Sequence, residues 1–407
     1  MADKGLKGTI AYGIAPHEGG TTTFYSNLAE GLRERGWRVL PVSVDKPFDP
    51  KFTDEHHISI NTGSRNLNDK VRLFIEWAIK ENINILLPMF ETEMLIALPY
   101  LPQKIRCITH CANIVRSAFI VSTLYLDRLS FVLTSSPRQF NLLHSQWGVP
   151  LSKLKLIPHG VDTSLFNYNP QKYRKNNELT LLYLGRIEDS AKGVMWLPSI
   201  LDKLKKQNIA FQLHIIGSGP DLIKLKKAFY HYGIGEKIIY HGSMERAKLP
   251  DILSKAEIFI MTSRFEGFGF TLIEAMATGC VPIASHIAGV TDTIITHRVD
   301  GFLCPIGDTE KFAQKIATLA TDPQKLAQMS QAAHQKVENG FNLERMVTDY
   351  DQVFTEAMVM PPVSFSPHSL NRVVLPKELQ PTWRTKIPQP IKNTIRKWVF
   401  RITGRMI

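Results

Sequence analysis

Residues 263–285 read SRFEGFGFTLIEAMATGCVPIAS, and the fold can be inferred outward from this stretch. The apolar run Glu257–Met261 precedes it and predicts a strand that ends near Thr262. A loop with two glycines follows, and Thr271–Thr278 predicts a helix. The run Val281–Ser285 predicts the next strand. A strand, a glycine-rich loop, a helix and another strand together predict a parallel βαβ unit.

The same alternation of short apolar runs and amphipathic segments extends along most of the chain. The other strand-like runs of the second half are Leu179–Leu184, Phe211–Ile216 and Lys237–Tyr240. Those of the first half are Thr9–Gly13, Val39–Val44, Ile83–Leu87, Ile105–His110 and Phe131–Ser135. Such alternation predicts an α/β protein whose parallel sheets are covered by helices on both faces. We expect two Rossmann-like domains that face each other across a cleft.

The polar stretch 168–178 interrupts the alternation and predicts a linker, which sets the domain boundaries. The predicted parts are an N-terminal Rossmann-like domain, a C-terminal Rossmann-like domain, a closing helix, and a Pro-rich linker with a basic amphipathic tail. Their ranges are 1–170, 171–342, 343–358 and 359–407, respectively.

Composition excludes several classes of protein. The 407 residues are 44% hydrophobic and 21% charged, which is ordinary for a globular chain and excludes wholesale disorder. The four cysteines are too few for a disulfide framework, and Cys107 and Cys111 form a lone pair without a second one at metal-binding spacing. The chain shows neither an apolar run long enough to span a bilayer nor a secretory signal, which favours a cytoplasmic protein.

The basic excess is local. The formal net charge is +12, but nine basic residues and one acidic residue lie beyond residue 360, so that +8 belongs to the tail. The first 360 residues carry only +4, which argues against a nucleic-acid partner for the body of the protein.

The loop and helix of the opening stretch have the chemistry of a phosphate site. Gly267 and Gly269 let a backbone approach a ligand closely. The N–H groups and the dipole at the start of the following helix favour a phosphate group. Glu266 lies on the loop and Glu274 about a turn into the helix, so that the two carboxylates can contact different parts of one ligand.

The stretch EGFGFTLIEAMATG resembles the E-x7-E signature of the retaining glycosyltransferases of family 4, within the glycosyl transferases group 1, which have the GT-B fold. The resemblance spans about residues 8–358 and continues in several shorter motifs. These are GG at 19–20, IPHGVD at 157–162, LGRIEDSAKG at 184–193, GSGP at 217–220 and DGFLCPIGD at 300–308. Thr271 and Ala288 depart from the residues common in the family.

The resemblance implies a transferase that moves a sugar from a nucleotide-diphosphate sugar. The C-terminal domain would bind this donor, and the N-terminal domain would face a glycan, lipid-linked or small-molecule acceptor. The enzyme would need no cofactor and no metal, and we find no D-x-D arrangement in a strand–loop context that would hold a divalent ion. Retention at the anomeric carbon is implied by the family alone.

The resemblance also implies roles for individual residues. The catalytic group would comprise Glu266 at the transferred sugar, His110 near the reacting sugar, and Arg186 and Lys192 at the donor diphosphate. Glu274 would accept hydrogen bonds from the ribose hydroxyls. The remaining donor-binding positions, which supply backbone to the diphosphate, would be Gly269, Phe270, Thr271, Leu272, Gly19 and Gly20.

Other functions remain open at this point. A dinucleotide oxidoreductase is disfavoured because Leu222 stands where the third glycine of the fingerprint belongs in GSGPDL. A sugar phosphorylase, a nucleotide-sugar epimerase and a non-catalytic GT-B scaffold that binds a partner or a membrane share the same motifs.

The sequence pattern of the C-terminal tail predicts a separate partner. Ile391, Ile395, Trp398 and Ile402 fall on one face of a helix, with basic residues beside them. A basic amphipathic helix with a tryptophan can lie in an anionic membrane surface. We therefore expect 391–407 either to attach the protein to the inner face of the membrane or to dock on its body.

Overall fold

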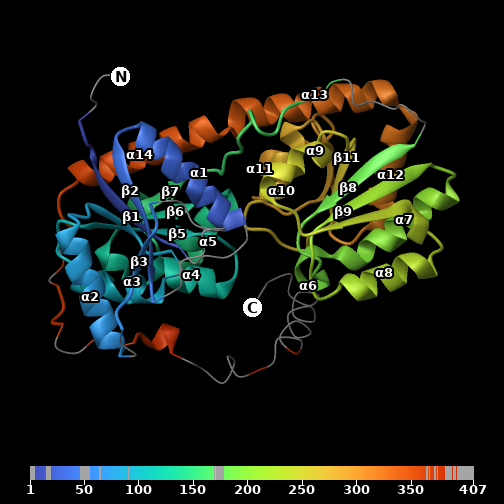
Figure 1. Ribbon diagram of the computed structural model, residues 1–407. Helices are drawn as coiled ribbons and strands as arrows, with labels where there is room; N and C mark the ends of the chain where they lie inside the picture. Colours follow the sequence, from blue (N-terminus) through green and yellow to red (C-terminus); the bar gives the residue numbers. More distant parts are fainter. Residues whose placement is uncertain are drawn as a thin grey trace. The chain divides into compact units, whose positions relative to one another are not determined.

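A computed structural model describes most of the chain. The described residues are 5–14, 20–45, 56–63, 66–89, 91–168, 170, 178–363, 365, 367–370, 373, 375–380, 387 and 391. They form two compact units, which divide at Pro158 and His159 and again after Leu343. The predicted two-domain α/β architecture is confirmed, and each unit is built on one parallel sheet (Figure 1).

The first unit contains a seven-stranded sheet in the order β3-β2-β1-β4-β5-β6-β7. Its strands are β1 (Gly8–Gly13), β2 (Trp37–Val44), β3 (Ile58–Ile60), β4 (Ile85–Leu87), β5 (Arg106–Cys111), β6 (Leu129–Thr134) and β7 (Leu154–Leu156). Its helices include α1 (Gly20–Glu34), α2 (Leu67–Lys80), α3 (Thr92–Ala97), α4 (Arg116–Thr123), α5 (Pro137–Trp147) and α14 (Leu343–Val359).

The second unit contains a six-stranded sheet in the order β10-β9-β8-β11-β12-β13. Its strands are β8 (Leu179–Leu184), β9 (Phe211–Ile216), β10 (Ile238–Gly242), β11 (Ile258–Met261), β12 (Val281–Ser285) and β13 (Phe302–Cys304). Its helices are α6 (Asp189–Lys192), α7 (Leu197–Lys206), α8 (Leu222–His231), α9 (Leu249–Leu253), α10 (Phe270–Ala277), α11 (Thr291–Ile294), α12 (Thr309–Thr321) and α13 (Pro323–Gly340).

Side chains of the second sheet alternate between two apolar cores. Leu181 and Ile260 belong to one core, together with residues of α7, α8 and α12. Leu182 and Phe259 belong to the other core, together with residues of α9, α10 and α11. Because successive residues of a strand point to opposite faces, strands covered on both faces read as continuous apolar runs. Figure 1 shows these two sets of helices on opposite faces of the sheet.

The boundary between the units lies before the predicted linker, because 159–168 pack on the second unit. The N–H of Val161 donates to Phe341 O at 2.8 Å, and the N–H of Leu343 donates to Val161 O at 2.9 Å. Phe166 is fully buried in the same core as α10. The sequence-based boundary at residue 170 therefore falls within the second unit, and most of the 168–178 stretch lies outside the described residues.

The predicted closing helix forms as α14 and packs on the first unit. Asp351 accepts hydrogen bonds from Trp37 Nε1 and from Lys7 Nζ, both at 2.7 Å. Tyr350 is fully buried, and its ring lies 5.9 Å from that of Phe24 in α1. The chain thus returns to its first unit after completing the second.

The Pro-rich segment continues along the first unit where it is described. Arg106 donates to Met360 O at 2.5 Å, His368 N–H donates to Pro99 O at 2.8 Å, and the His368 ring meets Tyr100 edge to face. The amphipathic tail predicted for 391–407 lies, apart from Ile391, outside the described residues. Nowhere in the described parts is a helix long and apolar enough to cross a membrane.

Candidate functional site

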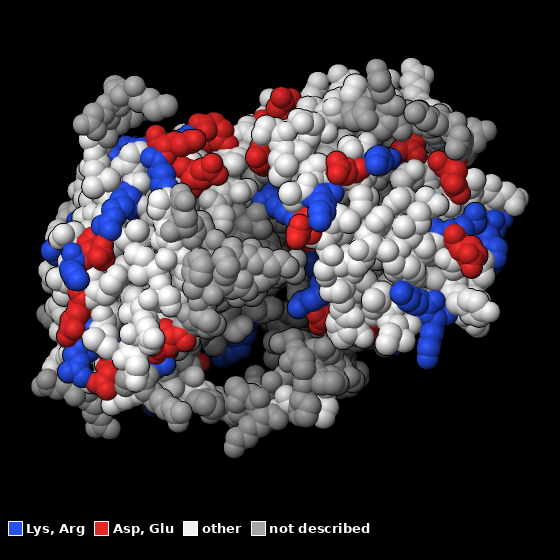
Figure 2. Space-filling view, in the orientation of Figure 1, with Lys and Arg blue, Asp and Glu red and all other residues white. Residues whose placement is uncertain are grey.

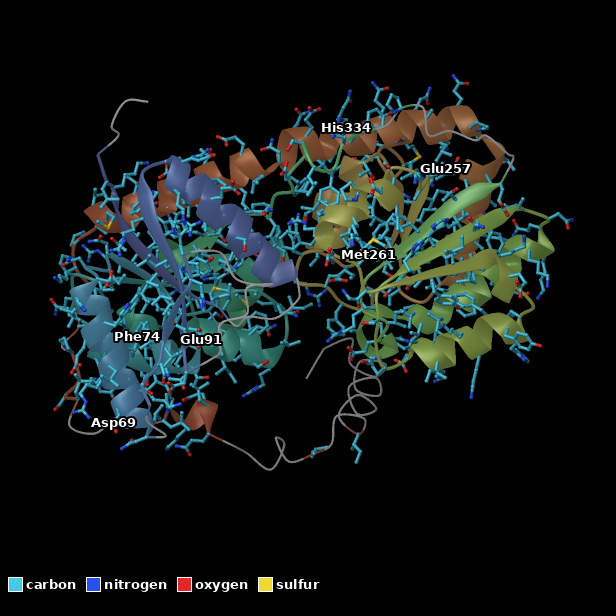
Figure 3. The ribbon with its side chains drawn as sticks, in the orientation of Figure 1. Asp69, Phe74, Glu91, Glu257, Met261 and His334 are labelled. Atoms are coloured by element: carbon cyan, nitrogen blue, oxygen red, sulfur yellow. The ribbon has the colours of Figure 1, made fainter. Side chains whose placement is uncertain are left out.

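The second sheet reverses its strand order beside β8, which pairs with β9 on one side and β11 on the other. In open parallel sheets, ligands bind beyond the carboxyl ends of the strands at such a reversal. Three loops leave the sheet there, at 185–188, 217–221 and 262–269. Figure 3 labels Glu257, just before β11, and Met261, the last residue of this strand, where the third loop departs.

Two of these loops interlock through glycines. The N–H of Ile187 donates to Ser218 O at 2.7 Å. Gly217 has a φ of +136°, and a Cβ at this position would lie 2.0 Å from Gly185 O. Only glycine fits such an approach of two backbones, so that the GSGP motif holds the loop that carries Arg186.

We expect Gly217→Ala to lower the free energy of unfolding by about 3 kcal/mol, because the methyl group meets a backbone oxygen at an unfavourable φ. Gly340→Ala is the matched control, since its Cβ would meet nothing within 4 Å at the end of α13. Denaturant unfolding measures both variants. Equal midpoints for the two would contradict the interlocked geometry.

Lys192, the last residue of α6, forms an ion pair with Glu266 in the loop after β11. Lys192 Nζ lies 2.5 Å from Glu266 Oε1, which also accepts from Ser263 Oγ at 2.7 Å. The Glu266 side chain is 11% exposed and the Lys192 side chain 25% exposed, so that water screens the pair only in part. The chain can turn after Lys192 because Gly193 adopts a φ of +60°, where a Cβ would lie 2.4 Å from Thr262 O.

Arg186 lies beside this pair. Its side chain is 63% exposed and its Nε contacts Glu188 Oε2 at 2.9 Å. The buried Tyr183 hydroxyl donates to Arg186 O at 2.9 Å. Burial and the negative charge of Glu266 raise the pKa of Tyr183, and Arg186 lowers it, so that both charges act on this phenol. The structure therefore places Arg186 and Glu266 near Tyr183, and Lys192 pairs with Glu266.

The predicted phosphate-binding backbone forms the start of α10. Gly269 precedes the helix with a φ of +113°, and its carbonyl accepts from the Leu272 N–H at 3.0 Å. Phe270 and Thr271 open the first turn, whose N–H groups point away from the helix body as in any α-helix. Phe270 is fixed by the ring of His159, which stacks on it at 4.5 Å between centroids.

Glu274 follows on α10 and is buried. Burial raises its pKa from 4.5 to about 7, although the positive charge of Arg246 acts in the opposite direction. Arg246 Nη2 lies 3.2 Å from Glu274 Oε1. The sequence analysis missed Arg246, since no spacing rule connects the turn after β10 with α10.

A second ion pair missed by the sequence analysis braces α6. Arg264 Nη2 lies 3.2 Å from Asp189 Oδ2, and its guanidinium lies 3.9 Å from the centre of the Trp196 ring. Because Arg264 follows β11 and Asp189 opens α6, this pair ties together the two segments that carry Glu266 and Lys192.

The remaining predicted residues lie in the first unit. His110 is buried near the end of β5, and its Nδ1 lies 2.8 Å from the Tyr25 hydroxyl of α1. Gly20 is the first residue of α1, and Gly19 lies outside the described residues. Gly13, at the end of β1, has no room for a side chain, because a Cβ would lie 2.2 Å from Pro88 O.

Burial lowers the pKa of His110 from 6.5 to about 4. Because the unfolded chain binds this proton more tightly, folding loses stability as the pH falls from 6.5 towards 4, by about 3 kcal/mol for this group. We expect His110→Asn to flatten the pH dependence of unfolding in that range. His286→Asn, at a half-exposed histidine, is the control for the substitution itself. An identical profile for wild type and His110→Asn would contradict the buried neutral imidazole.

Charges of both signs are mixed over the described surface of each unit in the view of Figure 2. Within the ranges that the structure describes, no group of three or more His, Cys, Asp or Glu residues is placed to hold a metal ion.

Comparisons with known proteins agree with this geometry. Residues 167–336 match the family model of the glycosyl transferases group 1. N-acetyl-alpha-D-glucosaminyl L-malate synthase of Bacillus anthracis is 22% identical over 87% of this chain and 98% of that protein. An Escherichia coli UDP-Gal:alpha-D-GlcNAc-diphosphoundecaprenol alpha-1,3-galactosyltransferase is 26% identical over 51% of this chain and 55% of its own length.

Among solved structures, Alr3699/HepE of Anabaena in complex with UDP and glucose superposes with a TM-score of 0.74. It is 18% identical, and the match covers 86% of this chain and all of that one. This likeness is one of fold.

Proposed function

We propose that this chain, a glycosyltransferase of group 1 with the GT-B fold, is a retaining enzyme of family 4. It moves a sugar from a nucleotide-diphosphate sugar to a glycan, lipid-linked or small-molecule acceptor. The observation that carries this proposal is the cluster of Arg186, Lys192 and Glu266 beside the start of α10, at the reversal of strand order.

The chemistry explains why this cluster suits the reaction. Breaking the bond between sugar and phosphate leaves an electron-poor sugar and a diphosphate that gathers negative charge. Positive groups and N–H donors aimed at the diphosphate therefore stabilise the transition state more than the ground state. We assign Arg186, Lys192 and the first-turn N–H groups of α10 at Phe270 and Thr271 to this task. Leu272, predicted for the same role, donates its N–H to Gly269 O instead.

In this proposal, Lys192 and Glu266 part when the donor binds. The diphosphate competes for Lys192, and the Glu266 carboxylate then accepts hydrogen bonds from the hydroxyls of the transferred sugar. Glu274 accepts hydrogen bonds from the ribose. We further assign His110 to the sugar, and Gly19 and Gly20 to the diphosphate. The donor is a substrate, and the proposal includes no cofactor and no metal.

Purified protein should release UDP, GDP or ADP slowly from one matching nucleotide sugar without an acceptor, and should transfer the sugar when an acceptor is present. Magnetic resonance of the product gives its anomeric configuration, and an inverted product would contradict retention. Turnover that requires orthophosphate would indicate a phosphorylase, and exchange of sugar epimers an epimerase. If the protein turns over none of the common nucleotide sugars, the result would indicate a non-catalytic GT-B scaffold.

We also propose that the protein is cytoplasmic and that 391–407 attach it to an anionic membrane, which would favour a lipid-linked acceptor. The basic and aromatic composition of the tail supports this proposal. Flotation with vesicles that contain anionic lipid tests it: the full chain should float, and a chain ending at residue 390 should not. Equal flotation of both would rule out the tail as the anchor.

A further inference from the structure

Arg246 faces the buried carboxylate of Glu274 from a separate element. It opens the 3₁₀ turn Arg246–Lys248 that follows β10, whereas Glu274 lies in α10. Its Nη2 lies 3.2 Å from Glu274 Oε1, and its guanidinium carbon lies 5.4 Å from the centre of the buried Phe166 ring. The guanidinium thus contacts both the ring and the carboxylate, and the Arg246 side chain is 18% exposed.

The hydrogen-bonding capacity of this guanidinium is not used up. Among the described residues its Nε, which is buried, has no hydrogen-bond partner, and its buried Nη2 has only the contact with Glu274 Oε1 at 3.2 Å. Leaving buried donors of a charged group unsatisfied costs free energy. A ligand that brings oxygen acceptors to this point would recover that cost.

Among the described residues of the elements packed against α10, Arg246 is the charged group that acts on Glu274. From α13, His334 bonds to Ala277 O at the C-terminal end of α10. Cys280, in the turn to β12, is buried against the carbonyls of Leu253 and Ala256. Neither acts on the pKa of Glu274, which burial raises and Arg246 lowers.

We propose that Arg246 is a positioning residue for the nucleoside end of the donor: it favours the ionised form of Glu274 and orients this carboxylate towards a ribose, and its spare N–H groups bind an oxygen of the same nucleoside. The inference rests on the proposed function, because it names the group that prepares the ribose contact. A neutral Glu274 would have to donate one of its hydrogen bonds and would hold the two adjacent hydroxyls of a ribose less well.

The test is a calorimetric titration with UDP, GDP and ADP from pH 6 to 9. Binding to wild type should strengthen as the pH rises through about 7, where Glu274 ionises. Arg246→Met should weaken binding about tenfold at pH 7 and move the profile upward by about one pH unit or more, since loss of the cation raises the pKa of Glu274 further. The matching 2′-deoxy nucleotide should show a smaller difference between the two proteins.

Two further variants distinguish the effect of the Arg246 charge from that of its hydrogen bonds, and an unfolding measurement checks that each variant folds. Lys248→Met is the matched control, because Lys248 lies in the same turn, is 67% exposed and pairs with Glu245. Arg246→Lys keeps the charge and loses the planar fork, so that its profile should stay in place while its affinity falls. Thermal unfolding without ligand shows whether each variant folds.

If Arg246→Met matches Lys248→Met in affinity and in pH profile while wild type binds a nucleotide, the inference is wrong and the proposed function stands. If wild type binds none of the three nucleotides, both are wrong.

Discussion

Replacing Lys192 with methionine is expected to lower the rate of sugar transfer about 10³-fold. Lys192 is half of an ion pair that exposes little of its surface, at the meeting point of the loops after β8 and β11. Methionine keeps most of the side-chain volume and removes the positive charge on which the departing diphosphate depends. The loss should therefore appear chiefly in kcat, because the charge on the diphosphate grows as the bond breaks.

Lys203→Met is the matched control for this variant. Lys203 also forms an ion pair with a glutamate, Glu310, at 2.8 Å, but this pair lies on α7 and α12, away from the three loops. Its rate should stay within a factor of two of wild type, roughly the scatter of surface substitutions. A Lys192→Met enzyme as fast as Lys203→Met would show that another group neutralises the diphosphate.

The ion pair also predicts a coupling between its two members. Among the described residues, Lys192→Met leaves the Ser263 hydroxyl as the hydrogen-bond donor to the Glu266 carboxylate. An isolated, partly buried charge is destabilising, whereas removal of both charges is tolerated better. We therefore expect Glu266→Gln to recover part of the stability that Lys192→Met loses, but none of its rate.

Glu274→Gln is expected to weaken binding of the donor nucleotide about 30-fold at pH 8, the loss of charged hydrogen bonds to two hydroxyls. Below pH 7 the difference from wild type should shrink, because Glu274, with its pKa raised to about 7, is then largely protonated as well. Isothermal titration of each nucleoside diphosphate at both pH values measures the effect.

Glu310→Gln serves as the control for Glu274→Gln, since Glu310 is 69% exposed and lies outside the three loops. It should bind nucleotide as wild type does at both pH values. If Glu274→Gln binds as tightly as Glu310→Gln at pH 8, Glu274 does not contact the ribose, and the orientation proposed for the donor is wrong.

The sequence predicted the parts of the fold whose cause is local. Buried strands such as Leu179–Leu184 are nearly continuous apolar runs, and the structure confirms them. The strands β3, β7 and β13, each of three residues, were missed because so short a run has no detectable period. β4 is equally short, but it lies within the longer apolar run Ile83–Leu87. The predicted closing helix is correct, but sequence spacing does not reveal that it packs against Trp37 and Phe24 of the first unit.

In the candidate site, too, the sequence predicted the residues that lie close together along the chain and missed the contacts between distant segments. Glu266, Gly269 and Glu274 follow one strand directly, so their proximity is local. The pairing of Lys192 with Glu266 depends on β8 and β11 becoming neighbours, and the pairing of Arg246 with Glu274 depends on how the turn after β10 meets α10. Contacts of this kind arise from tertiary packing, and their residues carry no periodic signal in the chain.

A crystal structure of the chain with the nucleoside diphosphate that binds it tests the central claim most directly. The account predicts density for the pyrophosphate at the start of α10, in contact with Lys192 and Arg186, with Glu266 released from Lys192. Density for the pyrophosphate elsewhere, with the Lys192–Glu266 pair intact, would contradict the account.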